Sequence, residues 1–521
     1  MSTTRTRPAT DALTRDALAV LQPGFRGTTA PDWVLRRLDE GLAAVAVFGR
    51  NVENPDQLAA LTAQLRAVRG DVLVAVDEEG GDVTRLEVRT GSSYPGNLAL
   101  GAVDDPELTR AVARDLGTRL AACGINLNWA PCADVNSDPG NPVIGVRSFG
   151  DTPAPVARHT AAYVEGLQSA GVAACTKHFP GHGDTAVDSH HDMPRVGVDL
   201  ATLRERELVP FRAAVAAGTR AVMSAHILLP ALDPERPATL SPAALHGLLR
   251  APVSEGGLGF DGLIVTDGIE MRAISATYGI ERGSVLALAA GADALCVGGG
   301  LSDEATVDRL RDALIRAVHD GDLPEERLAD AAARVRALAE WARGAAASAA
   351  PAPGAGAVEG AAPAPGLRAA RRALRRTARE PFTPLTAPVH VAGFTPVANI
   401  AVGDETPWGV AAELTRLLPG TTTTTYGAER ATAEGTDRLV AAVLTEAGRR
   451  RVVAVVRDAH RHPWMAAALT ALVAARPDTV VVEMGVPQAE PCGALHLATH
   501  GAARVCARAA AEALTGAAAD G

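Results

Sequence analysis

One short stretch of the chain concentrates groups that can move protons or hold metal ions. Residues 177–192 have the sequence KHFPGHGDTAVDSHHD and contain four of the chain's thirteen histidines together with three aspartates. In Asp188-Ser189-His190 the aspartate can accept one imidazole N–H, which fixes the tautomer and leaves the other ring nitrogen facing a substrate. The same spacing is typical of an Asx turn beside a surface histidine, so these residues alone leave both interpretations open.

A metal site is the second chemistry that this stretch allows. Histidine and carboxylate side chains gathered from several loops can bind zinc and related ions. The candidate ligands are His178, His182, His190 and Asp267. However, Pro180, Gly181 and Gly183 break the helix that an i, i+4 pair of histidines requires, and the chain contains no HExxH motif. We therefore expect neither a metal ion nor a cofactor.

The strands and helices that we predict along the chain follow a repeated pattern. Helical patterns such as residues 106–124 and 203–218 alternate with apolar runs, which are typical of parallel strands covered on both faces. Eight such units in roughly 340 residues predict an α/β fold of the (β/α)8 TIM-barrel type, with a doubly wound open sheet as the alternative. The predicted strands are residues 17–25, 42–49, 72–79, 125–131, 172–179, 221–227, 263–268 and 294–300.

Polar side chains stand at the ends of these apolar runs. They are Asp77, Glu78, Glu79, Lys177, His178, His226 and Asp267. The carboxyl ends of barrel strands meet on one face, and that face holds the active sites of TIM barrels. The sequence therefore predicts one site that combines carboxylates, a lysine and histidines. Taken alone, His226 is more typical of a packed, hydrogen-bonded core histidine than of a catalyst.

Five blocks of the sequence carry a family resemblance. They are VDEEGGDVTRL (76–86), GINLNWAPCADV (124–135), NPVIGVRSFG (141–150), KHFPGHGDTAVDSH (177–190) and IVTDGIEM (264–271). In this order, and over nearly all of residues 15–340, the chain resembles glycoside hydrolase family 3, in particular its β-N-acetylglucosaminidase branch. The resemblance implies a glycosidase that acts through a covalent glycosyl-enzyme.

The resemblance also implies roles for individual residues. Asp267 matches the catalytic nucleophile, which attacks the anomeric carbon. His190, oriented by Asp188, matches the general acid that protonates the leaving oxygen and the base that later activates water. A histidine acid is unusual, since most retaining glycosidases use two carboxyl groups about 5 Å apart. The residues that match the sugar-binding positions are Asp77, Arg85, Arg147, Lys177 and His178.

Two positions depart from the common pattern of the family. Glu78 and Asp82 stand where an amide and a basic residue are expected. Both add negative charge near Asp77, and we expect this charge to affect the outer subsites more than the chemistry.

A low-complexity stretch predicts a division of the chain into two domains. Residues 344–366 are rich in Ala, Pro and Gly and nearly free of charge, which is typical of a linker. We predict a catalytic barrel over residues 1–343 and a smaller α/β sandwich domain over residues 367–521. Buried strands of the second domain are predicted at residues 389–394, 451–459 and 479–485. Residues 367–380 contain six arginines and predict a solvated or docking helix.

Composition and charge disfavour several classes of protein. A formal charge of −10 disfavours a nucleic-acid binder, which needs a concentrated basic surface. No apolar run approaches the length of a membrane span, and the amino terminus lacks the apolar core of a signal peptide. The six cysteines form no CxxC pair, which disfavours a disulfide framework. We therefore expect a cytoplasmic protein that binds a small carbohydrate and has no nucleic-acid or membrane partner.

Together these features predict a retaining exo-β-N-acetylglucosaminidase (a β-N-acetylhexosaminidase) that acts on terminal GlcNAc of peptidoglycan fragments or chitin oligosaccharides. A phosphorylase on the same site is an alternative, because a neutral imidazole repels an anionic nucleophile less than a carboxylate does. A metal-dependent barrel hydrolase and a catalytically silent sugar-binding protein are hypotheses from other classes. The sequence does not indicate an oligomeric state.

Overall fold

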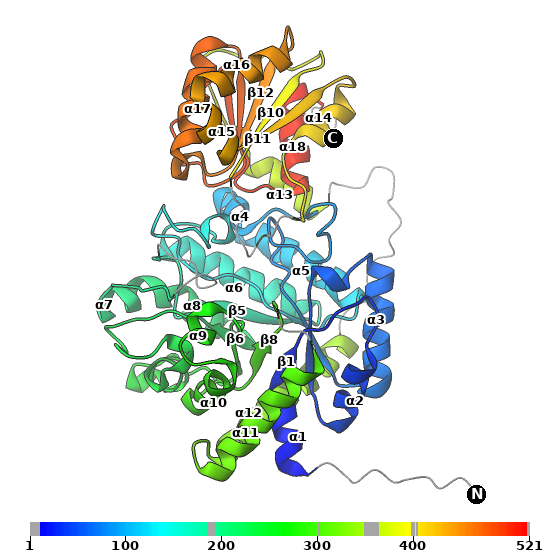
Figure 1. Ribbon diagram of the computed structural model, residues 1–521, viewed down its shortest axis with the longest axis vertical. Coiled ribbons are helices and arrows are strands. Elements are labelled where there is room, and N and C mark those ends of the chain that lie inside the picture. Colours follow the sequence, from blue (N-terminus) through cyan, green and yellow to red (C-terminus); the bar gives the residue numbers. More distant parts are fainter. Residues whose placement is uncertain are drawn as a thin grey trace, which may run out of the picture.

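Eight short strands form the first body of the structure. The computed structural model describes residues 11–185, 193–300, 303–348, 364–396, 402 and 405–517. Figure 1 shows two bodies, with the carboxyl-terminal one at the top. Every predicted barrel segment contains a strand, but each strand is shorter than the apolar run around it. The strands are β1 Leu21–Pro23, β2 Ala44–Val47, β3 Leu73–Val76, β4 Leu127–Asn128, β5 Ala173–Phe179, β6 Ala221–Ser224, β7 Leu263–Thr266 and β8 Leu295–Val297.

These strands close into a barrel. Strands β2 to β7 pair in sequence order as one parallel sheet, and β1 pairs with β8. Single parallel bridges join the two sheets: Gly24, just after β1, pairs with Ala46 of β2, and Val265 of β7 pairs with Ala294, just before β8. This closure confirms the predicted (β/α)8 barrel and excludes the doubly wound open sheet.

Helices cover the outside of the barrel (Figure 1). They are α1 Ala12–Ala19, α2 Asp32–Glu40, α3 Pro55–Val68, α4 Asn97–Val103, α5 Pro106–Ala122, α6 Pro153–Ser169, α7 Leu200–Thr202, α8 Leu208–Ala216, α9 Arg272–Ser275, α10 Ile280–Ala290, α11 Glu304–Asp320 and α12 Glu325–Ser348. Asn54 and Asp105 each accept a backbone N–H at the start of a helix, and a proline follows each of them at the first helical position. Within the described ranges, no helix is both long and apolar enough to span a membrane.

The first predicted strand is partly wrong. Residues 17–19 belong to α1, and the side chain of Asp11 caps this helix by accepting the backbone N–H of Thr14. Alanine and leucine are strong helix formers, so a capped run of them continues as a helix up to Val20. Only Leu21–Pro23 remains for β1.

The second body is a three-layered α/β sandwich. Its elements are α13 Pro365–Ala373, β9 Arg375–Ala378, β10 His390–Thr395, α14 Ala411–Leu417, β11 Thr422–Gly427, α15 Ala428–Glu434, α16 Thr436–Ala447, β12 Val452–Val456, α17 Pro463–Ala475, β13 Val480–Glu483, β14 Leu495–Ala498 and α18 Arg504–Thr515. The strands pair in the order β11-β10-β12-β13-β14-β9, and all pairs are parallel except that of β14 with β9. Side chains of β12 alternate between the faces: Val453 and Val455 pack with α14 and α18, whereas Val452 and Ala454 pack with α16 and α17.

The basic segment 367–380 differs from its prediction. Only its first part is helical, in α13, whereas Arg375 and Arg376 lie on the exposed edge strand β9. Long charged side chains are common on edge strands, because one side of such a strand stays in water. Strands β11 and β14 were not predicted either, since the first is mostly a run of threonines and the second is only four residues long.

The region between the two bodies is more helical than the predicted linker. Helix α12 continues to Ser348 and α13 begins at Pro365, so both ends of the predicted linker are helical. Residues 349–363 lie outside the described residues. Helix α13 packs against α4 and α5 of the barrel and against α18 of the second body. The domain boundaries proposed from the sequence therefore stay predictions.

Helix α4 packs closely on the segment that carries Arg147, and its Gly101 leaves no room for a side chain. A Cβ at Gly101 would lie 1.7 Å from the carbonyl oxygen of Phe149. We expect Gly101→Ala to lower the free energy of unfolding by about 1–3 kcal/mol, because the helix must move away from this segment. Gly70→Ala is the control in urea denaturation, because no atom lies within 4 Å of its added Cβ. Equal stability of the two variants would contradict this packing.

Candidate active site

The carboxyl ends of β3, β5 and β7 bring the predicted residues to one face of the barrel. Asp77 follows β3 directly, and Asp267 follows β7. Lys177 and His178 are among the last residues of β5. Parallel strands that close into a barrel end on the same face, so the order of the strands alone gathers these side chains.

Asp267 is held at the end of its strand by the backbone. Its Oδ1 accepts the N–H of Gly268 at 2.8 Å. In the barrel interior, burial raises the pKa of the Cys296 thiol. The charges of Glu270, Asp267 and Asp77 raise this pKa further. Asp77 and Asp267 directly follow β3 and β7, two strands of the same parallel sheet, so both lie on the same face of the barrel.

Five charged side chains form a connected ion network on this face. Lys177 Nζ pairs with Asp77 and lies 2.7 Å from Oε1 of Glu79. Arg147 donates Nε and Nη2 to Glu79, with 2.7 Å between Nη2 and Oε1. Arg85 Nη2 lies 3.4 Å from Oδ2 of Asp77. Two carboxylates thus hold three cations, and such cations donate hydrogen bonds to the oxygens of a polar ligand.

Mutual attraction keeps these groups charged although they are buried. Burial would raise the pKa of Glu79, but Arg147 and Lys177 hold it well below its usual range. Burial would lower the pKa of Lys177, but Asp77 and Glu79 raise it above the ordinary lysine value. Removing one partner would leave an unpaired buried charge, at a cost of about 3–5 kcal/mol. The network is therefore a strong constraint on the strand ends.

His178 is oriented by Asp134. Its Nδ1 lies 2.7 Å from Asp134 Oδ2, and its Nε2 lies 3.3 Å from Arg147 Nη2. Since a guanidinium has no acceptor, Nε2 must accept a hydrogen bond, and Nδ1 carries the proton that it donates to Asp134. Asp134 also accepts the backbone N–H groups of His178 and His182. It therefore fixes both the end of β5 and the loop that follows.

The loops after β4 and β5 are joined by direct contacts. Asn141 donates its side-chain NH2 group to the carbonyls of His182 and Gly183, at 2.9 and 3.1 Å. A Cβ on Gly183 would lie 1.7 Å from the carbonyl oxygen of Val135, so only glycine allows this approach. The segment that carries Arg147 is therefore tied to the segment that leads to the predicted catalytic loop.

The predicted proton-transfer pair, Asp188 and His190, lies outside the described residues, within the range 186–192. The loop is described as far as Thr185, whose hydroxyl lies 2.8 Å from Nδ1 of His182. The roles of Asp188 and His190 therefore stay predictions, as does the orientation of one by the other.

Two buried carboxylates of this site received no role in the prediction: Glu79 was expected on this face by its strand-end position alone, and Asp134 was not singled out. Glu79 bridges Arg147 and Lys177, and Asp134 fixes His178. Both stand in blocks that the sequence analysis quoted, and Glu79 follows a strand end. However, Glu79 is 68 residues from Arg147 and Asp134 is 44 residues from His178. Only the folded barrel reveals these pairings.

His226 stands at a strand end, but it is a packed core histidine with hydrogen bonds on both ring nitrogens. Its Nδ1 lies 2.9 Å from the hydroxyl of Thr239, and its Nε2 lies 2.9 Å from the carbonyl oxygen of Gly268. It is fully buried. It therefore supports the backbone next to Asp267 as a packed, hydrogen-bonded histidine.

One cluster among the described residues could hold a metal ion by distance alone. Ligand atoms of Cys132, Asp134 and His178 lie within 4.8 Å of one another. These atoms already exchange hydrogen bonds, because the Cys132 thiol and His178 Nδ1 both donate to Asp134 Oδ2. Burial also raises the pKa of the Cys132 thiol well above its usual value, which disfavours the thiolate that a metal needs. The cluster fits an orienting network better than a metal centre.

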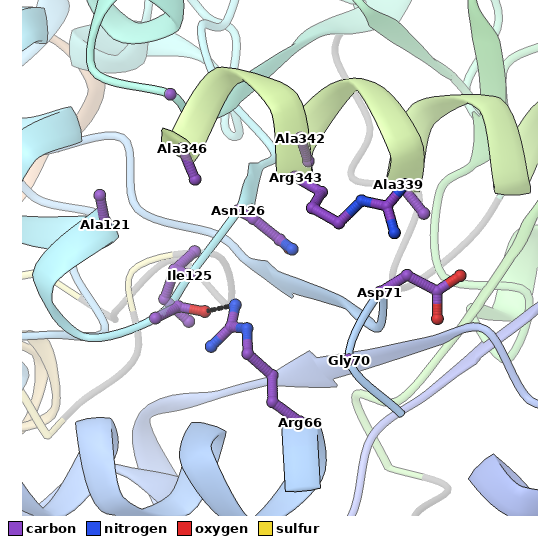
Figure 2. Close-up of a pocket in the computed structure, with 12 residues that line it drawn as sticks. Arg66, Gly70, Asp71, Ala121, Ile125, Asn126, Ala339, Ala342, Arg343 and Ala346 are labelled. Atoms are coloured by element: carbon purple, nitrogen blue, oxygen red, sulfur yellow. Dashed lines mark hydrogen bonds between the residues drawn. The ribbon is translucent and has the colours of Figure 1, made fainter. Parts of the chain in front are cut away.

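A cavity of about 220 Å³ lies at the opposite end of the barrel (Figure 2). Eight of its twelve lining residues come before β3, β4 or β5 rather than after them, and the other four belong to α12. Figure 2 shows Arg66 on one side and Arg343 of α12 on the other. The guanidinium of Arg66 donates to the carbonyl of Gly124. This end of a TIM barrel contributes to stability rather than to catalysis. We therefore assign no step of a reaction to this cavity.

Glu78 shapes the backbone between Asp77 and Arg85. It is buried, and its Oε2 accepts the hydroxyl of Thr84 and the backbone N–H groups of Arg85 and Leu86. The carboxylate of Glu78 therefore binds the backbone of its own turn. The sequence had led us to expect an effect on the outer subsites instead.

This environment makes Glu78 a source of pH-dependent stability. Burial raises its pKa to about 7, against 4.5 as the ordinary value. Between these values the folded state binds more protons than the unfolded state, so this contribution to the free energy of unfolding falls as the pH rises. Glu78→Gln keeps an oxygen acceptor and removes the titration. We expect the variant to gain on the order of 1–3 kcal/mol relative to the wild type between about pH 5 and about pH 8. Urea denaturation at both pH values measures this gain, and a pH-independent difference would contradict it.

Known proteins resemble this chain in both sequence and structure. A family model described as the glycosyl hydrolase family 3 N-terminal domain matches residues 29–338. The chain is 34% identical over 329 residues to β-hexosaminidase A of Pseudoalteromonas piscicida, which covers 58% of this chain and 54% of that protein. It is 38% identical over 271 residues to a β-hexosaminidase of Neisseria meningitidis serogroup C, covering 50% of this chain and 73% of that protein.

A solved structure covers both bodies. The family 3 β-N-acetylglucosaminidase from Paenibacillus sp. strain FPU-7 has a TM-score of 0.84, 37% identity, and coverage of 97% of each chain. The chain thus matches about half the length of the Pseudoalteromonas relative and nearly the full length of the Paenibacillus structure. The family model alone covers more than half of the sequence, and the chain belongs to glycosyl hydrolase family 3.

Proposed function

We propose that the protein is a retaining exo-β-N-acetylglucosaminidase, which removes one terminal GlcNAc at a time. The observation that carries this proposal is the ion network of Asp77, Glu79 and Lys177 on the barrel face that also holds Asp267. It presents charged acceptors and donors to the hydroxyl groups of one sugar ring. The relatives named β-hexosaminidase and β-N-acetylglucosaminidase support the same substrate class.

In the first step, a carboxylate oxygen of Asp267 attacks the anomeric carbon. The bond from this carbon to the glycosidic oxygen breaks, and His190 donates its proton to that oxygen as the aglycone leaves. His190 donates as an imidazolium, and Asp188 accepts its other N–H, so the nitrogen that has lost its proton still faces the sugar in the neutral ring. The products of this step are the aglycone, released as an alcohol, and a sugar bound covalently to Asp267 through an α-linkage.

In the second step, neutral His190 accepts a proton from water. The water oxygen attacks the anomeric carbon on the side that the aglycone left, and the bond to Asp267 breaks. Two inversions at one carbon give net retention of the β-configuration. An imidazole titrates near neutral pH without strong desolvation, so a loop can carry this acid–base group.

The ion network holds the sugar while these steps proceed. In this proposal, Asp77 accepts hydrogen bonds from two adjacent hydroxyls, and Arg85, Arg147 and Lys177 donate to ring substituents. His178 is fixed by Asp134 in the same region. Because these groups are already paired, they need little reorganisation when the sugar binds, which favours tight positioning of the anomeric carbon over Asp267.

The natural substrate and the location are part of the proposal. Peptidoglycan fragments and chitin oligosaccharides both end in the β-linked GlcNAc that this site would bind. A cytoplasmic location stays a prediction, and the six cysteines on which it partly rests are free thiols in the structure. Release of GlcNAc from a purified muropeptide and from chitotriose, compared by kcat/KM, would decide between the two substrates.

Asp267→Asn tests the nucleophile. We expect the loss of at least about 10³-fold in kcat on 4-nitrophenyl β-GlcNAc, because the amide cannot form the glycosyl ester. Asp478→Asn, at an exposed aspartate of the second body, is the control and should keep full activity. Near-normal activity of Asp267→Asn would remove the proposed mechanism.

His190→Ala tests the acid–base group. Since a good leaving group needs no proton, the loss of kcat/KM, which reports the first step, should be much larger for an alkyl β-GlcNAc than for the 4-nitrophenyl glycoside. Rates of both substrates for the variant and the wild type measure this contrast, and equal losses would contradict the assigned role. The same assay in phosphate buffer separates hydrolysis from phosphorolysis, because a phosphorylase would release GlcNAc 1-phosphate.

A further inference from the structure

The second body contacts the barrel at the turn that follows β3. Asp82 of this turn is buried and accepts two hydrogen bonds from the second body. One comes from the guanidinium of Arg457, just after β12, and the other from the backbone N–H of Ala502 at 2.7 Å. The guanidinium of Arg457 also lies 5.9 Å from the centre of the Trp408 ring. The second body therefore supplies two hydrogen-bond donors to a carboxylate that belongs to the barrel.

The turn that contains Asp82 lies between residues of the ion network. Glu79 precedes it and pairs with Lys177, whereas Arg85 follows it and lies 3.4 Å from Asp77. A displacement of Asp82 therefore acts on both ends of the segment that would hold the sugar.

The turn has little freedom to absorb such a displacement. Gly80 and Gly81 have φ angles of 75° and 63°, in the left-handed region that favours glycine. A Cβ on Gly81 would lie 2.4 Å from Cα of Gly96, so the backbones touch there. The Glu79 N–H donates to the carbonyl of Val83 at 3.1 Å, which closes the turn. A tightly packed turn of this kind moves as a unit.

Asp82 depends on its partners from the second body. Burial raises the pKa of its carboxyl group, and Arg457 is the largest opposing influence. A buried carboxylate that loses its cation is left with an uncompensated desolvation cost. The turn can reduce this cost by moving Asp82 toward water, and this movement would carry Arg85 with it.

We propose that Arg457 is a positioning residue for the sugar site, which acts through Asp82 on Arg85 and Asp77. This inference rests on the proposed function, because it concerns how tightly that site holds its sugar. In this way the second body contributes to the reaction through Asp82, although none of its described residues touches the reacting atoms. The acidic residue at position 82, where the family commonly has a basic one, is then one half of a charge pair with Arg457.

Other contacts keep the second body in place when Arg457 is changed. Arg504 Nη2 lies 2.9 Å from Glu87 and 2.6 Å from the hydroxyl of Ser93, and its Nε donates to the carbonyl of Gly91. These contacts lie farther along the same barrel segment and do not involve Asp82. A substitution at Arg457 therefore tests the turn rather than the docking of the whole body.

Arg457→Met removes the charge and keeps an apolar side chain over Trp408. We expect KM for 4-nitrophenyl β-GlcNAc to rise about tenfold while kcat stays within about threefold, because Arg85 and Asp77 hold the sugar in both the ground state and the transition state. Arg372→Met is the matched control. Arg372 also bridges the two bodies, through Asp105, but it lies away from the turn, so its KM should stay at the wild-type value.

The double variant Asp82→Asn/Arg457→Met identifies the path of the effect. If Arg457 acts through Asp82, removing the buried charge as well should return KM most of the way to the wild-type value. Arg457→Lys, which keeps the charge, should raise KM less than Arg457→Met does. An unchanged KM in Arg457→Met, or a double variant as impaired as Arg457→Met, would overturn the proposal.

A second measurement separates this proposal from the proposed function. Calorimetric titration with GlcNAc itself requires no catalysis, and Arg457→Met should bind it about tenfold more weakly than the wild type. A wild type that binds GlcNAc but does not hydrolyse the aryl glycoside would contradict the proposed function alone. Equal GlcNAc affinity of the wild type and Arg457→Met would contradict the positioning role alone.

Discussion

Opposite charges buried at the mouth of the barrel set the geometry on which the rest of the site depends. Lys177 has almost no contact with water and can stay charged only because Asp77 and Glu79 both face it. This requirement fixes the end of β5 against the end of β3. Arg147 and Arg85 extend the constraint to two loops. The ends of β3 and β5 and the two loops thus satisfy one electrostatic condition, on the same face of the barrel as Asp267.

Glu78 and Asp82, the two carboxylates that depart from the family pattern, both support the segment that carries Asp77 and Arg85. Glu78 bonds the backbone of the turn after β3, and Asp82 bonds the second body from the tip of that turn. Neither is free to add charge to an outer subsite, which is what the sequence analysis expected of them. Substitutions near a binding site can therefore act on its support rather than on the ligand, and only their contacts distinguish the two cases.

Much of the fold could be predicted because parallel strands covered on both faces are continuous apolar runs. The eight barrel strands and β10, β12 and β13 were found in this way. The prediction failed where a different signal decides the structure: residues 17–19 are helical because Asp11 caps them, and β9 is a strand because it pairs with β14. Partners far apart in the chain, such as Glu79 with Arg147 or Asp82 with Arg457, leave no local pattern in the sequence. Strand-end position predicted which residues share a face, but not which of them pair.

In the proposed mechanism, a sugar held by the ion network lies with its anomeric carbon over Asp267. The most direct measurement is mass spectrometry of the protein after incubation with a slow, fluorinated N-acetylglucosaminyl donor, followed by peptide mapping. We expect one added sugar, on the peptide that contains Asp267, and no adduct when excess GlcNAc occupies the site. A sugar attached to another residue, or turnover of the donor without any covalent adduct, would contradict it.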